Sequence, residues 1–195
     1  MIEKNFKKPI CLICNKKFFE NGEDGIYFYE KYIQKNLNYT NFDIPPVSLN
    51  NLNQNSLLFF VYNKKDLISN LLAIKNNDFI YIKDFSVSKG FKKTGYGFIT
   101  LFNAIDYFFK KTNFKEIRLL DDTVHENNKS YYEDNFLFEY IEEKNSMMRL
   151  SIEKFKSVDA KEFYEKKMSL YLNKIGTNNL NTYIKIENRN HFDEL

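Results

Sequence analysis

The chain has six glycines, and several of them fall within one short stretch, VSKGFKKTGYGF, at residues 87–98. In this stretch Lys92 and Lys93 precede Gly95 and Gly97, and an amphipathic segment follows at once. Small residues at a helix start let a phosphate approach the backbone closely, where the free N–H groups of the first turn and the positive end of the helix dipole bind it. The stretch therefore predicts an anion-binding loop, to which the two lysines add charge-assisted contacts.

Two better-known phosphate loops do not fit this stretch. A P-loop requires GxxxxGK[ST], and neither Gly95 nor Gly97 is followed by Lys-Ser or Lys-Thr. A dinucleotide-binding fingerprint requires a third glycine where Thr100 stands, and a strand that ends immediately before the first glycine. The acidic pair Asp121–Asp122 does follow the next predicted strand, but a chain of 195 residues has little room for the repeated halves of that fold. We therefore exclude the P-loop and disfavour the dinucleotide fold.

Hydrophobic periodicity predicts the elements that position the loop. Residues 98–109 carry apolar side chains at intervals of three and four, which indicates an amphipathic helix with Asn113 as its expected cap. Three strand-like runs precede this helix as an antiparallel meander, and the strand after it must be parallel to the third run, because a full helix connects the two. The expected order is a strand within 1–20, a helix from Gly25, a loop at 38–55, strands at 56–64, 66–77 and 78–87, the long helix, a strand at 116–122, a short helix at 126–136, strands at 137–143 and 145–154, a helix at 159–176 and a polar tail.

This order predicts an α+β fold with a mixed, mostly antiparallel central sheet and helices on both faces. We expect one domain at residues 1–155 and a C-terminal helical extension at 156–195. The extension should pack on or beside the domain, with a homodimer contact as the alternative.

Composition and charge exclude several classes of protein. A net charge of +3, from 29 basic and 26 acidic residues, is mild for a nucleic-acid binder. The apolar runs are too short to span a bilayer, and the N-terminus lacks the apolar region of a secretory signal. We therefore expect a cytoplasmic protein that binds neither membrane nor nucleic acid.

Cys11 and Cys14 form a CxxC motif with three interpretations. Zinc needs four ligands, and the two histidines, His125 and His191, lie far away in the sequence without a second ligand pair. A redox CxxC belongs at the start of a helix, whereas PICLICNKKFF indicates a short apolar strand. We favour two structural cysteines over the metal and redox alternatives, and we expect no metal.

The glycine stretch resembles the central motif of the GNAT superfamily of N-acetyltransferases, V-x-P-x-x-[RQ]-x-x-G-x-[GA]. Val87, Gly95 and Gly97 match this motif in register, and Lys92 takes the Arg/Gln position. The chain departs from the motif at Lys89, where proline is usual. It also departs at Lys92, because lysine cannot reproduce the forked hydrogen bonds of arginine.

The resemblance, which extends over residues 57–152 in the order of elements, implies acetyl-CoA as co-substrate. In the family this molecule lies in a wedge between two parallel strands that splay apart, here the strands ending near Val87 and Leu120. The backbone near Phe85 and Val87 would pair with the pantetheine arm and polarise the thioester carbonyl. The pyrophosphate would lie on the loop formed by Lys92, Lys93, Thr94, Gly95, Tyr96 and Gly97.

The resemblance also implies an enzyme that transfers an acetyl group to an amine of a small molecule, a peptide or a protein lysine. The acid that protonates the CoA thiolate would be Tyr131 or Tyr132, because the family pattern Y-x-x-x-G-F fits Tyr131 directly and Tyr132 with one inserted residue. We slightly favour Tyr132, which matches the local YE and the following FEY. Candidate bases that free the amine of its proton are Asp84, Asp121, Asp122 and His125.

Two other hypotheses remain beside this one. The same fold could serve as a binding module without catalysis, which is compatible with Lys92 and with Asn135 in the place of the pattern's glycine. The chain could also be an unrelated α+β protein, for which nucleic-acid binding through a Lys/Tyr-rich surface is the disfavoured but open alternative.

Overall fold

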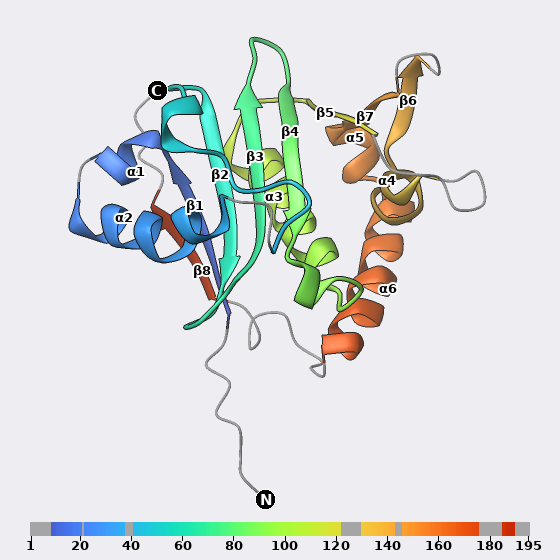
Figure 1. Cartoon of the computed structure of the whole chain (residues 1–195). Helices are drawn as coiled ribbons and strands as arrows, with labels where there is room; N and C mark the ends of the chain where they lie inside the picture. Colours follow the sequence, from blue (N-terminus) through green and yellow to red (C-terminus); the bar gives the residue numbers. More distant parts are fainter. Residues whose placement is uncertain are drawn as a thin grey trace, which may run out of the picture.

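A computed structural model of the chain describes residues 9–20, 22–37, 41–121, 130–142, 146–175 and 185–189. Within these ranges the strands form one eight-stranded sheet in the order β6-β7-β5-β4-β3-β2-β1-β8 (Figure 1). The strands are β1 (Ile10–Asn15), β2 (Ser56–Tyr62), β3 (Leu67–Lys75), β4 (Ile80–Val87), β5 (Glu116–Leu120), β6 (Glu139–Glu142), β7 (Met147–Ser151) and β8 (Lys185–Arg189). The α-helices are α1 (Lys16–Glu20), α2 (Glu23–Phe28), α3 (Tyr96–Lys111), α4 (Tyr131–Phe136), α5 (Ile152–Phe155) and α6 (Val158–Ile175). A π-helix, η1 (Tyr29–Ile33), continues α2, and short 3-10 turns are η2 (Gln34–Asn36), η3 (Leu49–Asn51) and η4 (Lys89–Phe91).

The sheet is mostly antiparallel, with parallel pairs at β4–β5 and β1–β8. The predicted meander is formed by β2, β3 and β4. The long helix α3 then returns the chain to the sheet, so that β5 pairs parallel with β4 as predicted. The predicted α+β class with a mixed, mostly antiparallel sheet is therefore confirmed.

Each face of the sheet has its own apolar core. On β3, Leu71 belongs to the core that contains α3, whereas Leu72 belongs to the core that contains α1, α2 and η1. Buried Phe98, Ile105 and Phe108 anchor α3 to the first core, which is the stripe that the period of three and four predicts. The C-terminal helix α6 joins this same core through residues that include Tyr164 and Leu172.

The structure differs from the sequence-based expectation near the C-terminus. The predicted polar tail contains β8, which extends the sheet by pairing parallel with β1. Its side chains are mostly exposed, Ile186 by 53%, so backbone pairing at a sheet edge holds it without the apolar face that sequence patterns detect. The short helix α5 was also not predicted. The C-terminal cap of α3 is Thr112 and not the expected Asn113, because the Thr112 hydroxyl donates a hydrogen bond to the carbonyl of Phe108.

The two cysteines are structural. Both are free and buried in β1, but Cys11 belongs to the α3-side core and Cys14 to the α2-side core. Residues three apart on an extended strand are separated by about 10 Å, beyond the reach of a disulfide or a shared metal. Burial raises the pKa of Cys11 to about 12 and raises that of Cys14 as well, so neither thiol is activated. The favoured interpretation of the CxxC motif is therefore confirmed.

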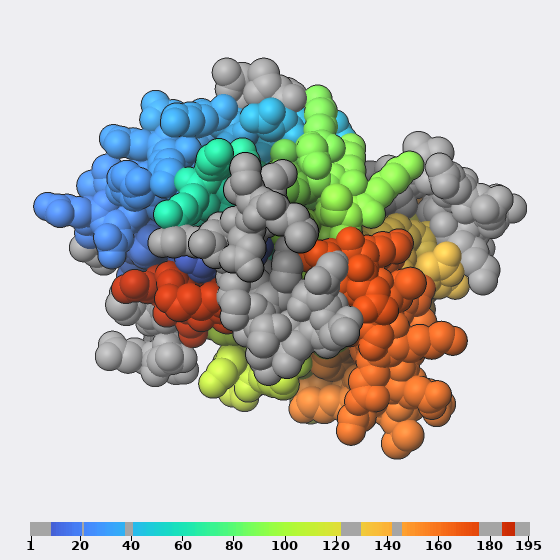
Figure 2. Space-filling view, turned by 90° about the horizontal axis from the view of Figure 1, so that it is seen from below, coloured from blue at the N-terminus to red at the C-terminus, as the bar shows by residue number. Residues whose placement is uncertain are grey.

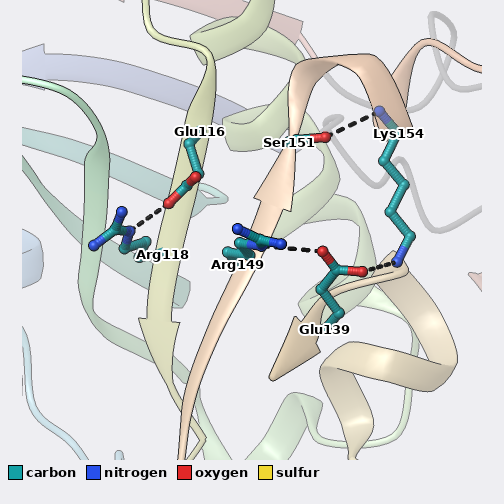
Figure 3. Close-up of polar contacts among 6 residues, drawn as sticks. All are labelled: Glu116, Arg118, Glu139, Arg149, Ser151 and Lys154. Carbon is teal, nitrogen blue, oxygen red and sulfur yellow. Dashed lines mark hydrogen bonds and ion pairs between the residues drawn. The ribbon is translucent and has the colours of Figure 1, made fainter. Parts of the chain in front are cut away.

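Ion pairs stabilise the β5–β7–β6 side of the sheet (Figure 3). Glu139 of β6 accepts from Arg149 of β7 and from Lys154 of α5, both over 3.0 Å. The Lys154 ammonium, with Arg149, lowers the pKa of Glu139. In the described part of the chain, no helix is both long enough and apolar enough to cross a membrane.

Candidate functional site

The parallel strands β4 and β5 pair only over the beginning of β4. Their register partners run from Ile80 to Ile82 on β4, and no described residue of β5 pairs with β4 beyond them. Lys83 is the extra residue of a β-bulge, because Ile82 and Asp84 pair with consecutive residues of β3. Bulges bend a strand and increase its twist, so β4 diverges from β5, and among the described residues none pairs with the last part of β4, up to Val87, on that side.

The segment after β4 enters α3 through residues with positive φ. Lys93 has a φ of 61°, and Gly95, the residue before α3, has a φ of 104°, in the left-handed region that favours glycine. Gly95 supplies no side-chain cap to the first turn of α3, so a bound anion can take that place. The positive end of the dipole of this sixteen-residue helix lies at the same point.

Gly97 brings β4, α3 and α4 into close contact. A Cβ at Gly97 would lie 3.2 Å from Cγ2 of Val87 and 3.6 Å from Cζ of Phe85. It would also lie 3.6 Å from the hydroxyl of Tyr131. Glycine therefore lets the end of β4 and the phenol of Tyr131 meet at the first turn of α3.

A cavity of about 580 Å³ lies around this meeting point. The site residues predicted from the sequence that line it are Phe85, Val87, Lys92, Lys93, Gly95, Gly97, Tyr131 and Tyr132. The structure thus brings together residues from β4, the loop, α3 and α4 that are separated in the sequence.

Several predicted residues do not line the cavity. The Thr94 hydroxyl donates to the carbonyl of Phe91, which turns it into the loop. Tyr96 is buried and packs edge-on against the ring of Phe91, with ring centroids 5.8 Å apart. The side chains of Thr94 and Tyr96 therefore stabilise the loop, and a contact of these two residues with a ligand would involve their backbone. Asp122 and His125 lie outside the described residues.

Asp84 lies on the other face of β4. It pairs in register with Leu72, which packs in the α2-side core, whereas Phe85 pairs with Leu71 on the α3 side. Burial raises the pKa of Asp84, and nearby Lys83 offsets this only in part. Asp121 is buried and accepts a 2.9 Å hydrogen bond from the hydroxyl of Tyr140.

Asp43 is a residue of the cavity that sequence reasoning missed. The Lys92 ammonium donates a short hydrogen bond to one oxygen of its carboxylate, and the Lys89 ammonium lies 3.9 Å from the other. This contact with Lys92 lowers the pKa of Asp43. The two partners are 49 positions apart, and no local pattern marks Asp43, so only the fold reveals the pair.

The cavity also includes part of the C-terminal helix α6, which sequence reasoning did not assign to the site. Tyr171 and Lys174 line it. The Tyr171 ring stacks on Phe98 of α3, with centroids 4.5 Å apart, and its hydroxyl donates over 2.8 Å to Oδ1 of Asn135 on α4. The apolar spacing of α6 indicates a packed helix, but it does not indicate where the helix packs.

The two tyrosines of α4 differ in their surroundings. Tyr131 has its hydroxyl beside Gly97, and burial is the main cause that raises its pKa above the ordinary value. Tyr132 lines the same cavity, and its backbone N–H donates over 3.1 Å to Ser130, the N-cap of α4. Of the two tyrosines, Tyr131 is the one whose hydroxyl lies beside Gly97.

A second cavity, of about 590 Å³, lies at the opposite end of the sheet, near the C-terminal end of α3. It is lined by residues that include Lys75, Lys111 and Lys115, and by none of the predicted site residues. The cavity at the start of α3 is therefore the candidate site.

Solved structures that resemble the chain include several acetyltransferases. The ribosomal-protein-S18-alanine N-acetyltransferase of Escherichia coli is 15% identical, with 73% of this chain and 94% of that chain covered and a TM-score of 0.47. The N-acetyltransferase PseH of Campylobacter jejuni, solved with acetyl coenzyme A, is 17% identical, with 73% and 99% covered and a TM-score of 0.47. Tetrahymena GCN5 is 13% identical, with 52% and 71% covered and a TM-score of 0.38. No protein-family model and no curated protein matches the chain.

At these identities the likeness concerns the fold alone. The strand order, the β4–β5 pair that separates after Ile82 and the glycine loop before α3 are features of the chain itself. Together they form the arrangement that the resemblance of the stretch from Val87 to Gly97 implies, with two parallel strands that separate and a glycine-containing loop at the start of the next helix.

Proposed function

We propose that the chain is an acetyltransferase that uses acetyl-CoA and acts on an amine. One observation carries the proposal: the end of β4, the first turn of α3 and the hydroxyl of Tyr131 meet at Gly97 within one cavity. An acyl transfer from a phosphate-bearing thioester needs an anion site, a backbone edge and a proton donor close together. The three elements that meet at Gly97 supply one each.

The residues of the cavity suit coenzyme A. The end of β4 offers N–H and C=O groups to an amide-bearing arm, in the way that a sheet edge accepts an added strand. The loop before α3 offers a helix N-terminus and the ammonium groups of Lys92 and Lys93 to the phosphates. A Cβ at Gly97 would narrow the space between the end of β4, the first turn of α3 and the hydroxyl of Tyr131.

The reaction forms a bond between the amine nitrogen and the acetyl carbon, and it breaks the carbon–sulfur bond of the thioester. The departing thiolate needs a proton, and we assign its donor to Tyr131. A phenol is protonated at neutral pH, so Tyr131 has a proton to donate to the departing thiolate. The sequence slightly favours Tyr132, but the position of the Tyr131 hydroxyl beside Gly97 supports Tyr131.

We assign the base to Asp84, directly or through water. Burial raises its pKa toward the range in which a carboxylate accepts protons effectively near neutral pH. Asp84 lies on the α2 side of β4, opposite the face of Phe85. The amine would therefore approach from the α2 side while the phosphates bind on the α3 side.

Thermal denaturation with acetyl-CoA tests the binding part of the proposal. Saturating acetyl-CoA should raise the melting temperature, because a ligand that binds only the folded state stabilises it by mass action. An unchanged melting temperature would remove acetyl-CoA from the proposal.

Release of free CoA thiol tests catalysis, with spermidine, a lysine peptide and an aminoglycoside as amine probes and with hydrolysis as the background. Tyr131→Phe should lower the rate about 100-fold or more while the affinity for CoA stays within about twofold. Tyr132→Phe is the matched control and should stay within about threefold of wild type. Equal rates for wild type and Tyr131→Phe would overturn the assignment of the acid, and binding without any thiol release would favour a binding module.

A further inference from the structure

The C-terminal helix α6 forms one wall of the candidate cavity, although it lies beyond the residues whose order resembles the acetyltransferase motif. Tyr171 and Lys174 of α6 line the cavity together with Lys92 and Gly95 of the loop. Figure 2 shows the orange surface of α6 beside the light-green surface of β4 and the segment after it. The helix is therefore placed to contribute side chains to whatever the cavity binds.

The contacts of Tyr171 fix α6 relative to the phosphate loop. Its ring lies 4.5 Å from that of Phe98, centroid to centroid, at an angle of 18°. Its hydroxyl is hydrogen-bonded to Asn135. Its carbonyl oxygen would lie 3.0 Å from a Cβ at Gly95, and Ile175 lies 3.4 Å from the same point. The last turn of α6 is thus packed against Gly95, the residue before α3.

The direction of α6 places Lys174 at the phosphate end of the cavity. Near the middle of the helix, the Tyr164 hydroxyl donates to the carbonyl of Phe136 on α4, the helix that carries Tyr131. About two turns later Tyr171 contacts Gly95, and Lys174 follows. The helix therefore runs from α4 toward the start of α3.

The lysines that line the cavity differ in their ion pairs. Three lysines line the cavity, and Lys92 already holds the carboxylate of Asp43. Within the described ranges, no carboxylate forms an ion pair with Lys93 or Lys174. The Lys174 ammonium lies 4.9 Å from the ring centroid of Tyr171, a cation–π contact that orients it.

We propose that Lys174 binds a phosphate of coenzyme A, so that the C-terminal helix completes the cofactor site of this chain. The inference rests on the proposed function, because it names the ligand of the same cavity. Coenzyme A offers two phosphate groups of suitable charge, the pyrophosphate and the 3′-phosphate of its ribose. Lys174 contributes to affinity for one of them, beside the loop and the helix N-terminus.

A purely structural role for Lys174 gives a different result. Lysine in the last turn of a helix also stabilises the negative end of the helix dipole. That role would change the stability of the free protein and leave its affinity for coenzyme A unchanged. Melting temperature without ligand and affinity for the ligand are therefore measured separately.

Calorimetric titration of the full chain with coenzyme A at low salt tests the proposal. Lys174→Met should weaken binding about tenfold, the size expected for one charge-assisted hydrogen bond. Lys174→Arg keeps the charge and should stay within about threefold of wild type. Lys166→Met removes an exposed lysine of the same helix that does not line the cavity, and its affinity should not change. The loss in Lys174→Met should shrink as added salt screens the charge.

Titration with 3′-dephospho-CoA identifies the phosphate. If Lys174→Met weakens binding of both ligands equally, Lys174 contacts the pyrophosphate. If it weakens binding of coenzyme A alone, Lys174 contacts the 3′-phosphate. Equal affinities of Lys174→Met and Lys166→Met for coenzyme A would overturn the inference and leave the proposed function standing. Failure of the wild type to bind coenzyme A would instead overturn the proposed function and, with it, this inference.

Discussion

The phenol of Tyr171 donates a 2.8 Å hydrogen bond to Oδ1 of Asn135, which joins the C-terminal helix α6 to α4. The ammonium of Lys167 donates to the same oxygen over 3.2 Å. The amide nitrogen of Asn135 donates over 2.9 Å to the carbonyl of Tyr131. Asn135 stands where the acetyltransferase pattern has glycine, so this departure from the pattern is the point at which α6 docks.

Asn135→Gly should therefore destabilise the protein. The change removes the acceptor of two donors from α6 and adds a flexible residue to α4, for a loss of about 2–3 kcal/mol in the free energy of unfolding. Urea denaturation measures this loss. Tyr171→Phe is the matched variant: it removes one hydrogen bond, keeps the ring on Phe98 and should cost about 1 kcal/mol. Wild-type stability in Asn135→Gly would contradict docking through this side chain.

Gly95 should tolerate substitution far less well than Gly90. Alanine at Gly95 would adopt an unfavourable φ of 104° and bring a Cβ to 3.0 Å from the carbonyl oxygen of Tyr171. A strained position of this kind costs about 1–3 kcal/mol. A Cβ at Gly90 meets no atom within 4 Å and its φ is not positive, so Gly90→Ala should be neutral or slightly stabilising.

Thermal or urea denaturation of the two variants without ligand tests this difference. Equal stabilities would mean that neither the backbone of Gly95 nor its contact with α6 constrains the fold. We also expect Gly95→Ala to lower the affinity for CoA more than it lowers the stability, because the loop that contains Gly95 lines the cavity.

The glycine-containing loop before α3 and the sheet could be predicted from the sequence because their signals are local. Gly95 and Gly97 lie next to a strand end and to a helix with regular apolar spacing, and the parallel pairing of β5 follows from the length of the connection. The motif around Val87 also marks the residues of the loop that line the cavity.

Long-range contacts account for what the sequence did not reveal. Asp43 binds Lys92, which lies 49 positions away in the sequence. Tyr171 of α6 contacts Phe98 and Asn135, but the apolar spacing of α6 indicates only that this helix packs against something and does not indicate its partners. β8 is held by backbone pairing with β1, and pairing at an edge leaves little apolar periodicity to detect. In each case the partner is fixed by tertiary structure, and neither composition nor spacing near the residue encodes it.

Asp43→Asn should strengthen binding of coenzyme A. The Asp43 carboxylate holds the ammonium of Lys92 and places a negative charge in a cavity that we assign to phosphates. Asparagine keeps the shape of the side chain, removes the charge and leaves Lys92 available to the ligand. We expect affinity to rise about two- to fivefold at low salt, because an exposed ion pair contributes little energy.

Calorimetric titration with coenzyme A measures this gain, and the gain should diminish at high salt. Asp66→Asn changes an exposed aspartate that does not line the cavity and provides the control. Weaker binding in Asp43→Asn would show that the carboxylate positions Lys92 for the ligand instead of competing with it.

Asp84→Asn should stabilise the protein at neutral pH and slow the proposed reaction. Burial raises the pKa of Asp84 above its ordinary value of 3.8, so the folded state disfavours the ionised carboxylate. The contribution of Asp84 to stability is therefore fully present below pH 3.8 and is lost as the pH rises through the raised pKa. Asparagine does not titrate, so the melting temperature of Asp84→Asn should exceed that of wild type at pH 7. The difference should vanish as the pH falls below the ordinary value.

Rate measurements across the same pH range complete this prediction. If Asp84 is the base, the wild-type rate falls at acid pH as the Asp84 carboxylate is protonated. Asp84→Asn should be about 100-fold slower than wild type, and its rate should no longer fall at acid pH. Asp66→Asn again provides the control and should keep the wild-type profile. A wild-type acid limb that persists unchanged in Asp84→Asn would assign the titration to another group, while the stability difference between the two proteins would still report the burial of Asp84.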